Sequence, residues 1–471
     1  MADAQLLIGA EGVGRILQSK YEGSHKKLIL ISICALIGAF NFGIAIGYSS
    51  PSIPSMIKRG ILKPGESDWF ASLLTVGALL GGPVGGWLIE KVGRKLSLTF
   101  LSIPFAAGFF IIASATAGFH CCFGRFLTGI GSGMVTVCVP VYIAEVATSS
   151  MRGVLGSCVQ LFVTIGIAAA YILGSLFEWR WLANLCIVPC VLGGALTFFI
   201  PETPRYLLKK NRKTDALFAL KTLRDPHTNV NEECREIEEK SEAGELTSLS
   251  EILKKRELFH PVLLILVVLI FQQLSGINAV MFFTVSILEA AVGEFAYIAT
   301  VIVGVVQVLG TLMAVFLMDR AGRRKLLNVA GVILSVTLVS FGLYYKLVAT
   351  GFFGTFLKTW FPVMCLTVYI LGFSIGWGPV PMLLMSELIP TRCKGIAGSA
   401  AAIASWGSAF LVTSQFSALQ NALGSSGVFY LFSACCAVSV WFVSKYIPET
   451  KGRSLEDIER HFSSEKPADL V

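Results

Sequence analysis

The chain has 471 residues, of which 54% are hydrophobic and 14% charged, and its mean hydropathy is +0.72. This composition excludes an ordinary soluble protein and is typical of a chain that crosses a membrane many times. The net charge of +8 does not indicate a nucleic-acid partner, because the Lys and Arg residues fall in short clusters between apolar runs, as the positive-inside rule requires.

Residues 1–27 are predicted to form a cytoplasmic N-terminus, since they lack the apolar core of a cleavable signal peptide. The segment Asp3-Ala4-Gln5-Leu6-Leu7-Ile8 resembles an acidic dileucine sorting signal. Such short matches also arise by chance. We therefore expect a multi-pass protein of the plasma membrane, with an endolysosomal membrane as the alternative.

Apolar runs of about 20 residues, the length that crosses a bilayer, occur twelve times along the chain. They lie at approximately 28–48, 68–89, 96–116, 121–143, 154–175, 181–200, 261–288, 296–318, 326–346, 360–385, 396–418 and 427–447. An even number of spans puts both termini on one side, and the basic clusters on that side make it cytoplasmic. The sequence predicts an all-α membrane protein of twelve transmembrane helices.

The second and fourth spans carry closely spaced glycines, and the fourth also carries an arginine. Gly77, Gly81 and Gly85, and likewise Gly129 and Gly133, are small residues at helical spacing, which allow close contact between helices. Arg125 begins the charge-free part of span 4. We expect its side chain to reach the outer interface by snorkelling rather than to bind substrate.

The residues from 201 to 260 form the longest hydrophilic stretch and divide six spans from six. Its apolar periodicity predicts short amphipathic helices on the inner membrane face, with a solvated linker as the alternative. The predicted organisation is an N-terminus at 1–27, a six-helix bundle at 28–200, a cytoplasmic linker at 201–260, a second bundle at 261–447 and a C-terminus at 448–471.

Span 7 contains an amide-rich patch, Phe271-Gln272-Gln273-Leu274-Ser275-Gly276-Ile277-Asn278, inside the charge-free run 261–288. Three amides in such a run need hydrogen-bond partners, and a polar ligand can provide them. Ser275-Gly276 lies between them and is a place where the helix can loosen, so that all three turn toward one cavity. This is typical of a substrate site in a transporter.

Several motifs occur once in each half of the chain. Charged residues follow spans 2 and 8, an acid with a basic residue follows spans 4 and 10, and the triplets at 201–203 and 448–450 both read Pro-Glu-Thr. The repeat predicts two parallel six-helix halves with the ligand between them. The repeated charged residues are Glu90 and Arg94 with Asp319, Arg323 and Arg324, and Glu145 and Arg152 with Glu387 and Lys394.

These motifs, with Pro201-Glu202-Thr203-Pro204-Arg205, Gly378-Pro379-Val380-Pro381 and Pro448-Glu449-Thr450-Lys451-Gly452, resemble the sugar porter family of the major facilitator superfamily. Gly376-Trp377-Gly378-Pro379 and Gly47-Tyr48-Ser49-Ser50-Pro51 look most like insect facilitated trehalose transporters and related hexose facilitators. The resemblance implies facilitative transport of trehalose or a glucose-like hexose by alternating access, in a carrier that functions as a monomer.

Matched position by position, the family's sugar contacts correspond to Gln160 in span 5, Gln272, Gln273 and Asn278 in span 7, and Gln307 in span 8. Amides suit a sugar because hydroxyls both donate and accept hydrogen bonds. The alternative is that each amide only bridges helices. Met382 stands where the family usually has a Trp, and we expect Trp377 and Trp406 to replace that aromatic surface in part. Ser405, Ala409 and Phe282-Phe283 are further departures, which suggest a different or larger sugar.

The resemblance also implies that the repeated charges form salt bridges holding the inner helix ends together while the site faces outward. Simple topology anchoring is the alternative. Glu145 and Glu387 favour pairing, because an acid at the end of an apolar span is costly without a partner. The prolines of Gly378-Pro379-Val380-Pro381 interrupt span 10 and predict either a gating hinge or a static kink.

No Asp or Glu occurs from Leu28 to Ile57, and family symporters carry an Asp at the position of Ala45 or its neighbour. Facilitated diffusion is therefore favoured over proton symport. A sugar sensor that does not transport is a third hypothesis, but only 451–471 follow the last motif, where sensors usually carry a long tail. The twelve cysteines lie mostly in apolar spans without metal or disulfide spacing, so they imply neither metal nor disulfides. We expect no cofactor and no enzyme activity, because the sequence shows no nucleophile–base pair, metal cluster or phosphate loop.

Overall fold

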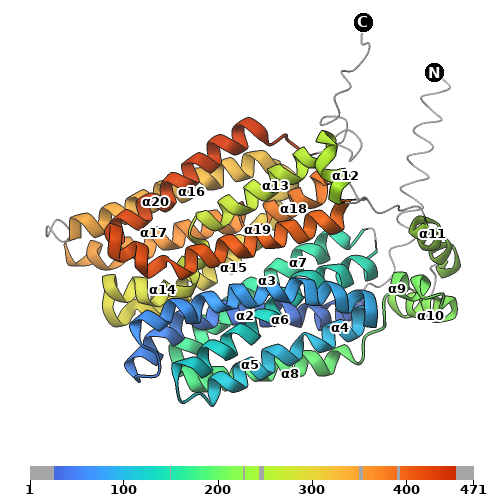
Figure 1. Ribbon diagram of the computed structural model, residues 1–471, viewed down its shortest axis with the longest axis horizontal. Helices are drawn as coiled ribbons and strands as arrows, with labels where there is room; N and C mark the ends of the chain where they lie inside the picture. Colours follow the sequence, from blue (N-terminus) through green and yellow to red (C-terminus); the bar gives the residue numbers. More distant parts are fainter. Residues whose placement is uncertain are drawn as a thin grey trace, which may run out of the picture.

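The computed structural model describes residues 26–148, 150–225, 229–242, 249–348, 354–389 and 393–451. The secondary-structure elements in these ranges are helices, and the long ones form two bundles that lie side by side (Figure 1). Short helices of the central linker lie beyond one end of the bundles (Figure 1). By the predicted topology this end is cytoplasmic, and the opposite end is called the outer end below.

The first bundle contains six membrane crossings. Its third crossing is divided at Leu101 into two helices, and a short 3-10 helix, η1 (Pro64–Glu66), precedes the second. The crossings are α2 (Lys26–Lys58), α3 (Ser67–Val92), α4 (Arg94–Phe100) with α5 (Ser102–Ala113), α6 (Gly118–Val146), α7 (Arg152–Leu176) and α8 (Trp179–Thr197).

The second bundle repeats this arrangement with two broken crossings. Its elements are α13 (Arg256–Leu274) with α14 (Ile277–Val292), η2 (Gly293–Phe295), α15 (Ala296–Ala321), α16 (Arg323–Val348), α17 (Thr355–Ile375) with α18 (Val380–Leu388), α19 (Lys394–Ser414) and α20 (Phe416–Tyr446). Eleven stretches of the described residues are long and apolar enough to cross a membrane, and one of them, Leu258–Met318, has 61 residues. That stretch holds two crossings, α13–α14 and α15, so the predicted fold of twelve transmembrane helices is confirmed.

Close packing of α3 on α6 confirms the small-residue signal. A Cβ atom placed on Gly81 would lie 2.1 Å from the carbonyl oxygen of Ile130, and one placed on Gly133 would lie 2.1 Å from that of Ala78. Both distances are far below van der Waals contact. Only glycine therefore allows the two backbones to approach this closely.

The linker between the bundles contains α9 (Pro204–Lys209), α10 (Lys213–Leu223), α11 (Val230–Glu242) and α12 (Leu249–Lys254). The first three share a small apolar core, in which Leu207, Leu220 and Cys234 are buried. Arg224 fastens this unit to the first bundle: Nη1 donates to the carbonyl oxygen of Val146 at the end of α6, at 2.8 Å, and the guanidinium pairs with Glu233. The short helices predicted for the linker are therefore present.

The bundles meet where α7 packs on α15, α3 on α19 and α2 on α14. The Tyr171 hydroxyl donates to the carbonyl oxygen of Met281 at 3.0 Å, and the backbone N–H of Val285 donates to Ser50 Oγ at 3.0 Å. These residues lie in the outer halves of their membrane crossings. The structure is therefore closed at the outer end.

Candidate functional site

Span 7 breaks at the position that the sequence predicts. Helix α13 ends at Leu274, Gly276 has the left-handed φ of +85°, and α14 begins after it. A Cβ atom on Gly276 would lie 2.4 Å from Cδ2 of Phe432, so both the backbone conformation and the space require glycine. The Tyr369 hydroxyl donates to the freed carbonyl oxygen of Ser275 at 3.0 Å, which satisfies part of the broken helix.

The break brings the three amides of span 7 into one hydrogen-bonded chain. Gln272 Nε2 donates to the carbonyl oxygen of Trp377 at 2.5 Å. Gln273 Nε2 donates to Gln272 Oε1 at 3.2 Å and to Ser405 Oγ at 3.1 Å. Asn278 Nδ2 donates to Gln273 Oε1 at 2.6 Å. The chain joins α13, α14, α17–α18 and α19 through groups that can exchange partners with sugar hydroxyls.

The two remaining amides lie on helices that face each other across the bundles. Gln307 on α15 is 3% exposed, and its Oε1 is buried with no hydrogen-bond partner in the described part of the chain. An unsatisfied buried acceptor costs about 1–3 kcal/mol, which a ligand hydroxyl would recover. Gln160 on α7 is partly exposed. Among the described residues, no hydrogen bond links either side chain to the amide chain.

The two tryptophans lie in different surroundings. Trp377 is 1% exposed, and its Nε1 donates to the carbonyl oxygen of Leu327 in α16 at 3.1 Å. Its ring therefore packs within the second bundle, and its backbone carbonyl is the group that meets Gln272. Trp406 on α19 is half-buried and meets Phe42 of the first bundle edge to face, with ring centroids 6.0 Å apart. Trp406 thus presents its ring where the bundles meet.

The prediction that Arg125 snorkels to the outer interface is wrong. Its side chain is fully buried, with 0% exposure. The guanidinium donates to the carbonyl oxygen of Ala45 and to Ser49 Oγ in α2. It also lies over the rings of Phe70, at 5.4 Å, and of Phe282 in the second bundle, at 5.7 Å. Hydropathy places Arg125 in a span but does not reveal that it faces the bundle interior.

Arg125 bears on the question of proton coupling. No acidic side chain in the described ranges pairs with it; its partners are a carbonyl, a hydroxyl and two ring faces. Such dipoles and ring faces can solvate a buried cation without a counter-ion. Ala45 contributes only its backbone oxygen, at the position where an Asp was considered.

The inner end of the first bundle is held by a buried ion pair. Arg94 Nη2 and Nε approach the two carboxylate oxygens of Glu145, each at 2.9 Å, and the side chains are 8% and 11% exposed. The Thr203 hydroxyl also donates to Glu145, at 2.6 Å. This bidentate geometry links α4, α6 and the loop after α8.

The second bundle repeats the arrangement at its inner end. Arg323 Nη2 lies 2.9 Å from Glu387 Oε1, and the Thr450 hydroxyl donates to Glu387 Oε2 at 2.6 Å. The side chains of Arg323 and Glu387 are 13% and 19% exposed. Each pair lies inside one bundle, so in this structure both hold helices of the same half together.

Glu202 and Glu449 each cap the start of a helix, which the sequence did not predict. Glu202 Oε1 accepts from the backbone N–H groups of Arg94 and Lys95, at 3.1 and 3.2 Å. Glu449 does the same for the first two N–H groups of α16, at 2.9 and 3.2 Å. Burial raises the pKa of Glu202, although these N–H bonds favour its charged form. The repeated Pro-Glu-Thr triplet was the available signal, but it did not reveal this helix-capping role.

The other charged residues have separate places. Glu90 pairs with Lys209 of α9 at the surface, and the Arg324 guanidinium donates to the carbonyl oxygen of Ser444. Arg152 is exposed, and among the described residues it makes no ion pair. The side chains of Asp319 and Lys394 lie outside the described residues, as does the dileucine-like segment at 3–8.

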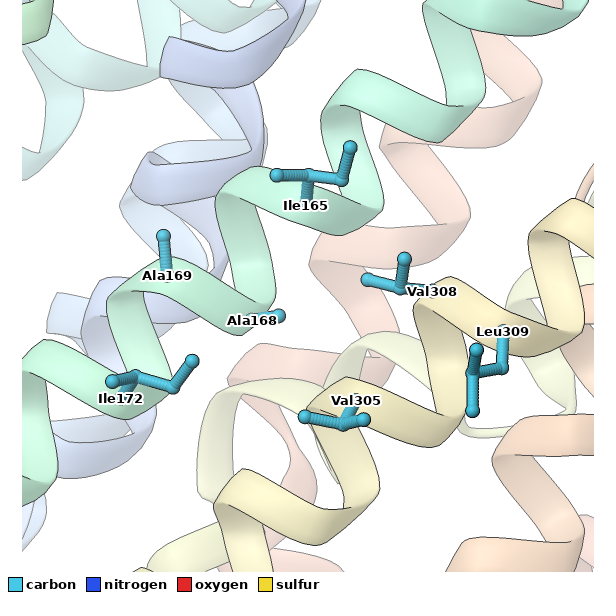
Figure 2. A pocket seen from close by; sticks show the side chains of 7 residues that line it. All are labelled: Ile165, Ala168, Ala169, Ile172, Val305, Val308 and Leu309. Atoms are coloured by element: carbon cyan, nitrogen blue, oxygen red, sulfur yellow. The ribbon is translucent and has the colours of Figure 1, made fainter.

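A groove between α7 and α15 is a separate feature. It has a volume of about 260 Å³, and Figure 2 shows that side chains from both helices line it. All are apolar: Ile165, Ala168, Ala169, Ile172, Val305, Val308 and Leu309. A site for sugar needs polar groups that fix the orientation of hydroxyls, so this groove does not fit one.

Comparisons with known proteins show which sequences resemble this chain. The model of a family described as "Sugar (and other) transporter" matches residues 31–462. Mouse solute carrier family 2, facilitated glucose transporter member 8, is 40% identical over 457 residues, which cover 93% of this chain and 94% of the mouse protein. The facilitated trehalose transporter Tret1 of Drosophila mojavensis is 36% identical over 442 residues, or 92% of this chain and 51% of that protein.

Solved structures show the same fold. The proton:xylose symporter XylE bound to 6-bromo-6-deoxy-D-glucose has a TM-score of 0.77 and 22% identity, covering 94% of this chain and 100% of that chain. The inward open conformation of XylE from E. coli also has a TM-score of 0.77 and 22% identity, over 92% of this chain and 99% of that one.

Proposed function

This chain belongs to the sugar transporter family, and from that premise we propose that it carries a glucose-like hexose or trehalose across a membrane by facilitated diffusion. The amide chain at the break of span 7 carries the proposal. Its members bond mainly to one another, to Ser405 and to a backbone carbonyl, so a sugar can replace these bonds without uncovering a charge.

Gln272, Gln273 and Asn278 form the polar floor of the proposed site, and Gln307 adds the unsatisfied oxygen on α15. Gln160 on α7 is the contact from the first bundle. Trp406 offers a ring face to the apolar side of a pyranose, whereas Trp377 acts through its backbone. Rocking of the bundles about this site, without cofactor or catalysis, moves the sugar.

Uptake into proteoliposomes tests this function. Radiolabelled glucose and trehalose are each offered to vesicles containing the purified chain, and each is tested as a competitor of the other. We expect saturable uptake of at least one sugar and inhibition by the other. The names of the mouse and fly relatives support these two sugars. A chain that binds sugar but gives no flux would instead be a sensor.

Proton symport is a second candidate, because this chain shares its fold with XylE, a proton:xylose symporter. The surroundings of Arg125 favour facilitated diffusion, since in the described structure its partners include no carboxylate that can exchange a proton. A protonophore separates the two. We expect initial uptake to be unchanged by it, and collapse of uptake would establish symport.

The plasma membrane is the proposed location, and the monomer the proposed functional unit. Fluorescence microscopy of a tagged chain tests the location against the endolysosomal alternative. If the segment at 3–8 directs sorting, the double change Leu6→Ala and Leu7→Ala will move the chain from internal membranes to the cell surface.

A further inference from the structure

A carboxylate of the first bundle binds the start of a helix in the second. Asp68 lies in the first turn of α3 and is 9% exposed. Its Oδ1 accepts from the hydroxyl of Ser417 at 2.8 Å, and its Oδ2 accepts from the backbone N–H of Ser417 at 3.2 Å. Ser417 is the second residue of α20.

These bonds cap the first part of α20, which a non-helical Gly424 separates from the rest of the helix. The first N–H groups of a helix have no partner within the helix, and an acidic group at that end also interacts well with the helix dipole. Gln415, which precedes α20, makes no capping hydrogen bond with its own side chain. The cap for this helix is therefore supplied by the opposite bundle.

The contact lies where the outer end is closed. Next to Asp68, the ring of Trp69 lies 6.4 Å from that of Phe410 on α19. The bond from the Val285 N–H to Ser50 Oγ also crosses between the bundles toward this end. When the outer ends separate, Asp68 and Ser417 move apart with their bundles, and water must replace both bonds.

We propose that Asp68 is a positioning residue of the transport cycle, which keeps the carrier closed on the outside by capping α20 across the two bundles. The inference rests on the proposed alternating-access function. Its effect is on the balance between outward-open and outward-closed carrier, not on sugar contacts. Removing the carboxylate shifts that balance toward the outward-open form.

The rate at which an external reagent labels a cysteine between the bundles measures the balance between outward-open and outward-closed carrier, and it needs no sugar. Ser50→Cys, a buried position between the bundles, serves as reporter in every variant, and the parent without it gives the background of native thiols. With a membrane-impermeant maleimide, we expect Asp68→Ala to label about 5 to 30 times faster, as for loss of about 1–2 kcal/mol. Asp68→Asn keeps an acceptor and should show a smaller increase.

Ser417→Ala tests the other side of the contact. It removes one of the two groups that donate to Asp68 and should give a labelling rate between those of the parent and Asp68→Ala.

Two further variants are controls. Glu178→Ala removes an outer carboxylate that pairs with Arg59 inside the first bundle, and should leave the labelling rate unchanged. Ser414→Ala removes a hydroxyl that, in the described structure, bonds within α19 to the carbonyl oxygen of Leu411, and should give the parent rate.

Transport kinetics provide the second readout. A shift toward outward-open carrier lowers the external KM for zero-trans entry and raises the internal KM for exit, whereas a general folding defect lowers Vmax alone. An unchanged labelling rate in Asp68→Ala, in protein that reaches the membrane, overturns the proposal. If that variant fails to reach the membrane, Asp68→Asn and Ser417→Ala decide by the same criterion. If the variants label at the expected faster rates but the parent protein gives no sugar flux, the transport function is contradicted instead.

Discussion

Gln273 is the centre of the amide chain, since it donates to Gln272 and Ser405 and accepts from Asn278. Gln273→Leu removes the hydrogen bonds that Gln272, Ser405 and Asn278 make with this side chain, and Asn278→Ala removes the end of the chain. We expect each change to abolish saturable sugar uptake while leaving surface expression intact. Radiotracer uptake normalised to surface protein is the measurement.

An amide outside the site gives the control. Asn184 on α8 is exposed, and its side chain donates only to the carbonyl oxygen of Arg180 in the same helix. Asn184→Ala should therefore retain wild-type uptake. Wild-type kinetics in both Gln273→Leu and Asn278→Ala would refute the site assignment.

The inner ion pairs differ in how much stability they provide. Arg94→Ala leaves Glu145 buried and without its bidentate partner, which costs about 3–5 kcal/mol in comparable buried pairs. Lys209→Ala breaks an exposed pair with Glu90, which is worth at most about 1 kcal/mol. We expect a large fall in the Tm of detergent-solubilised protein for the first change and almost none for the second.

The double variant Arg94→Ala with Glu145→Ala separates pairing from general damage. Removing both charges should recover part of the Tm lost by either change alone, because no unpaired charge stays buried. Strictly additive losses would show that the two side chains do not stabilise each other.

At this scale the sequence predicted that the three amides of span 7 can come together, but not the orientation of every candidate side chain. Three amides in an uncharged span must find polar partners, and the structure brings those three together. Arg125 and Trp377 were less predictable, because span membership says nothing about which neighbour a side chain meets. The contacts that position them come from α2 and α16, which are distant in sequence.

Among the elements, the broken crossing of span 7 depends on Gly276. Gly276→Ala adds a Cβ atom 2.4 Å from Phe432 and forces an L-residue into left-handed φ, which by itself costs about 1–2 kcal/mol. We expect low surface expression and a reduced Tm. Gly60→Ala is the control, since Gly60, in the turn after α2, also has positive φ, +70°, but no atom lies within 4 Å of its Cβ position.

Comparison of the two variants isolates packing from backbone strain. If Gly60→Ala lowers Tm as much as Gly276→Ala, the contact with Phe432 contributes little and strain explains both effects. A clearly larger effect at Gly276 would show that the break is fixed by its packing against α20.

Hydropathy predicted the crossings well but not where their helices end. Span 12 was expected at 427–447, whereas α20 spans Phe416–Tyr446 and is interrupted at Gly424, which has a non-helical φ of +69°. The part after this break starts close to the expected limit, so hydropathy located the crossing and missed only the short helical part that precedes Gly424. Likewise, the interruption at Leu101 in span 3 leaves no mark in hydropathy.

Over the whole molecule, the linker helices α9–α11 lie with the first bundle, whereas α12 packs on α13 of the second. Arg224 is 9% exposed and binds both Glu233 and the end of α6, so Arg224→Ala should loosen this unit. We expect faster proteolysis within 204–242 and a lower Tm. Lys213→Ala, which breaks an exposed pair with Glu238, should leave both close to wild type.

Limited proteolysis in reconstituted vesicles, with the cytoplasmic side outward, measures this difference. Equal cleavage rates for Arg224→Ala and Lys213→Ala would mean that the apolar core of α9–α11 holds the unit without Arg224.

Arg125 binds a backbone carbonyl oxygen, that of Ala45, rather than a carboxylate, and this choice of partner affects which way sugar can move. In the part of the chain that the structure describes, no carboxylate pairs with this buried cation, so this place offers no titratable pair that can draw on a proton gradient. A carrier that works by facilitated diffusion speeds the approach to equal sugar concentrations on both sides and cannot exceed it. Net import or export is then decided by whichever compartment consumes or releases the sugar, and the same molecule serves both directions.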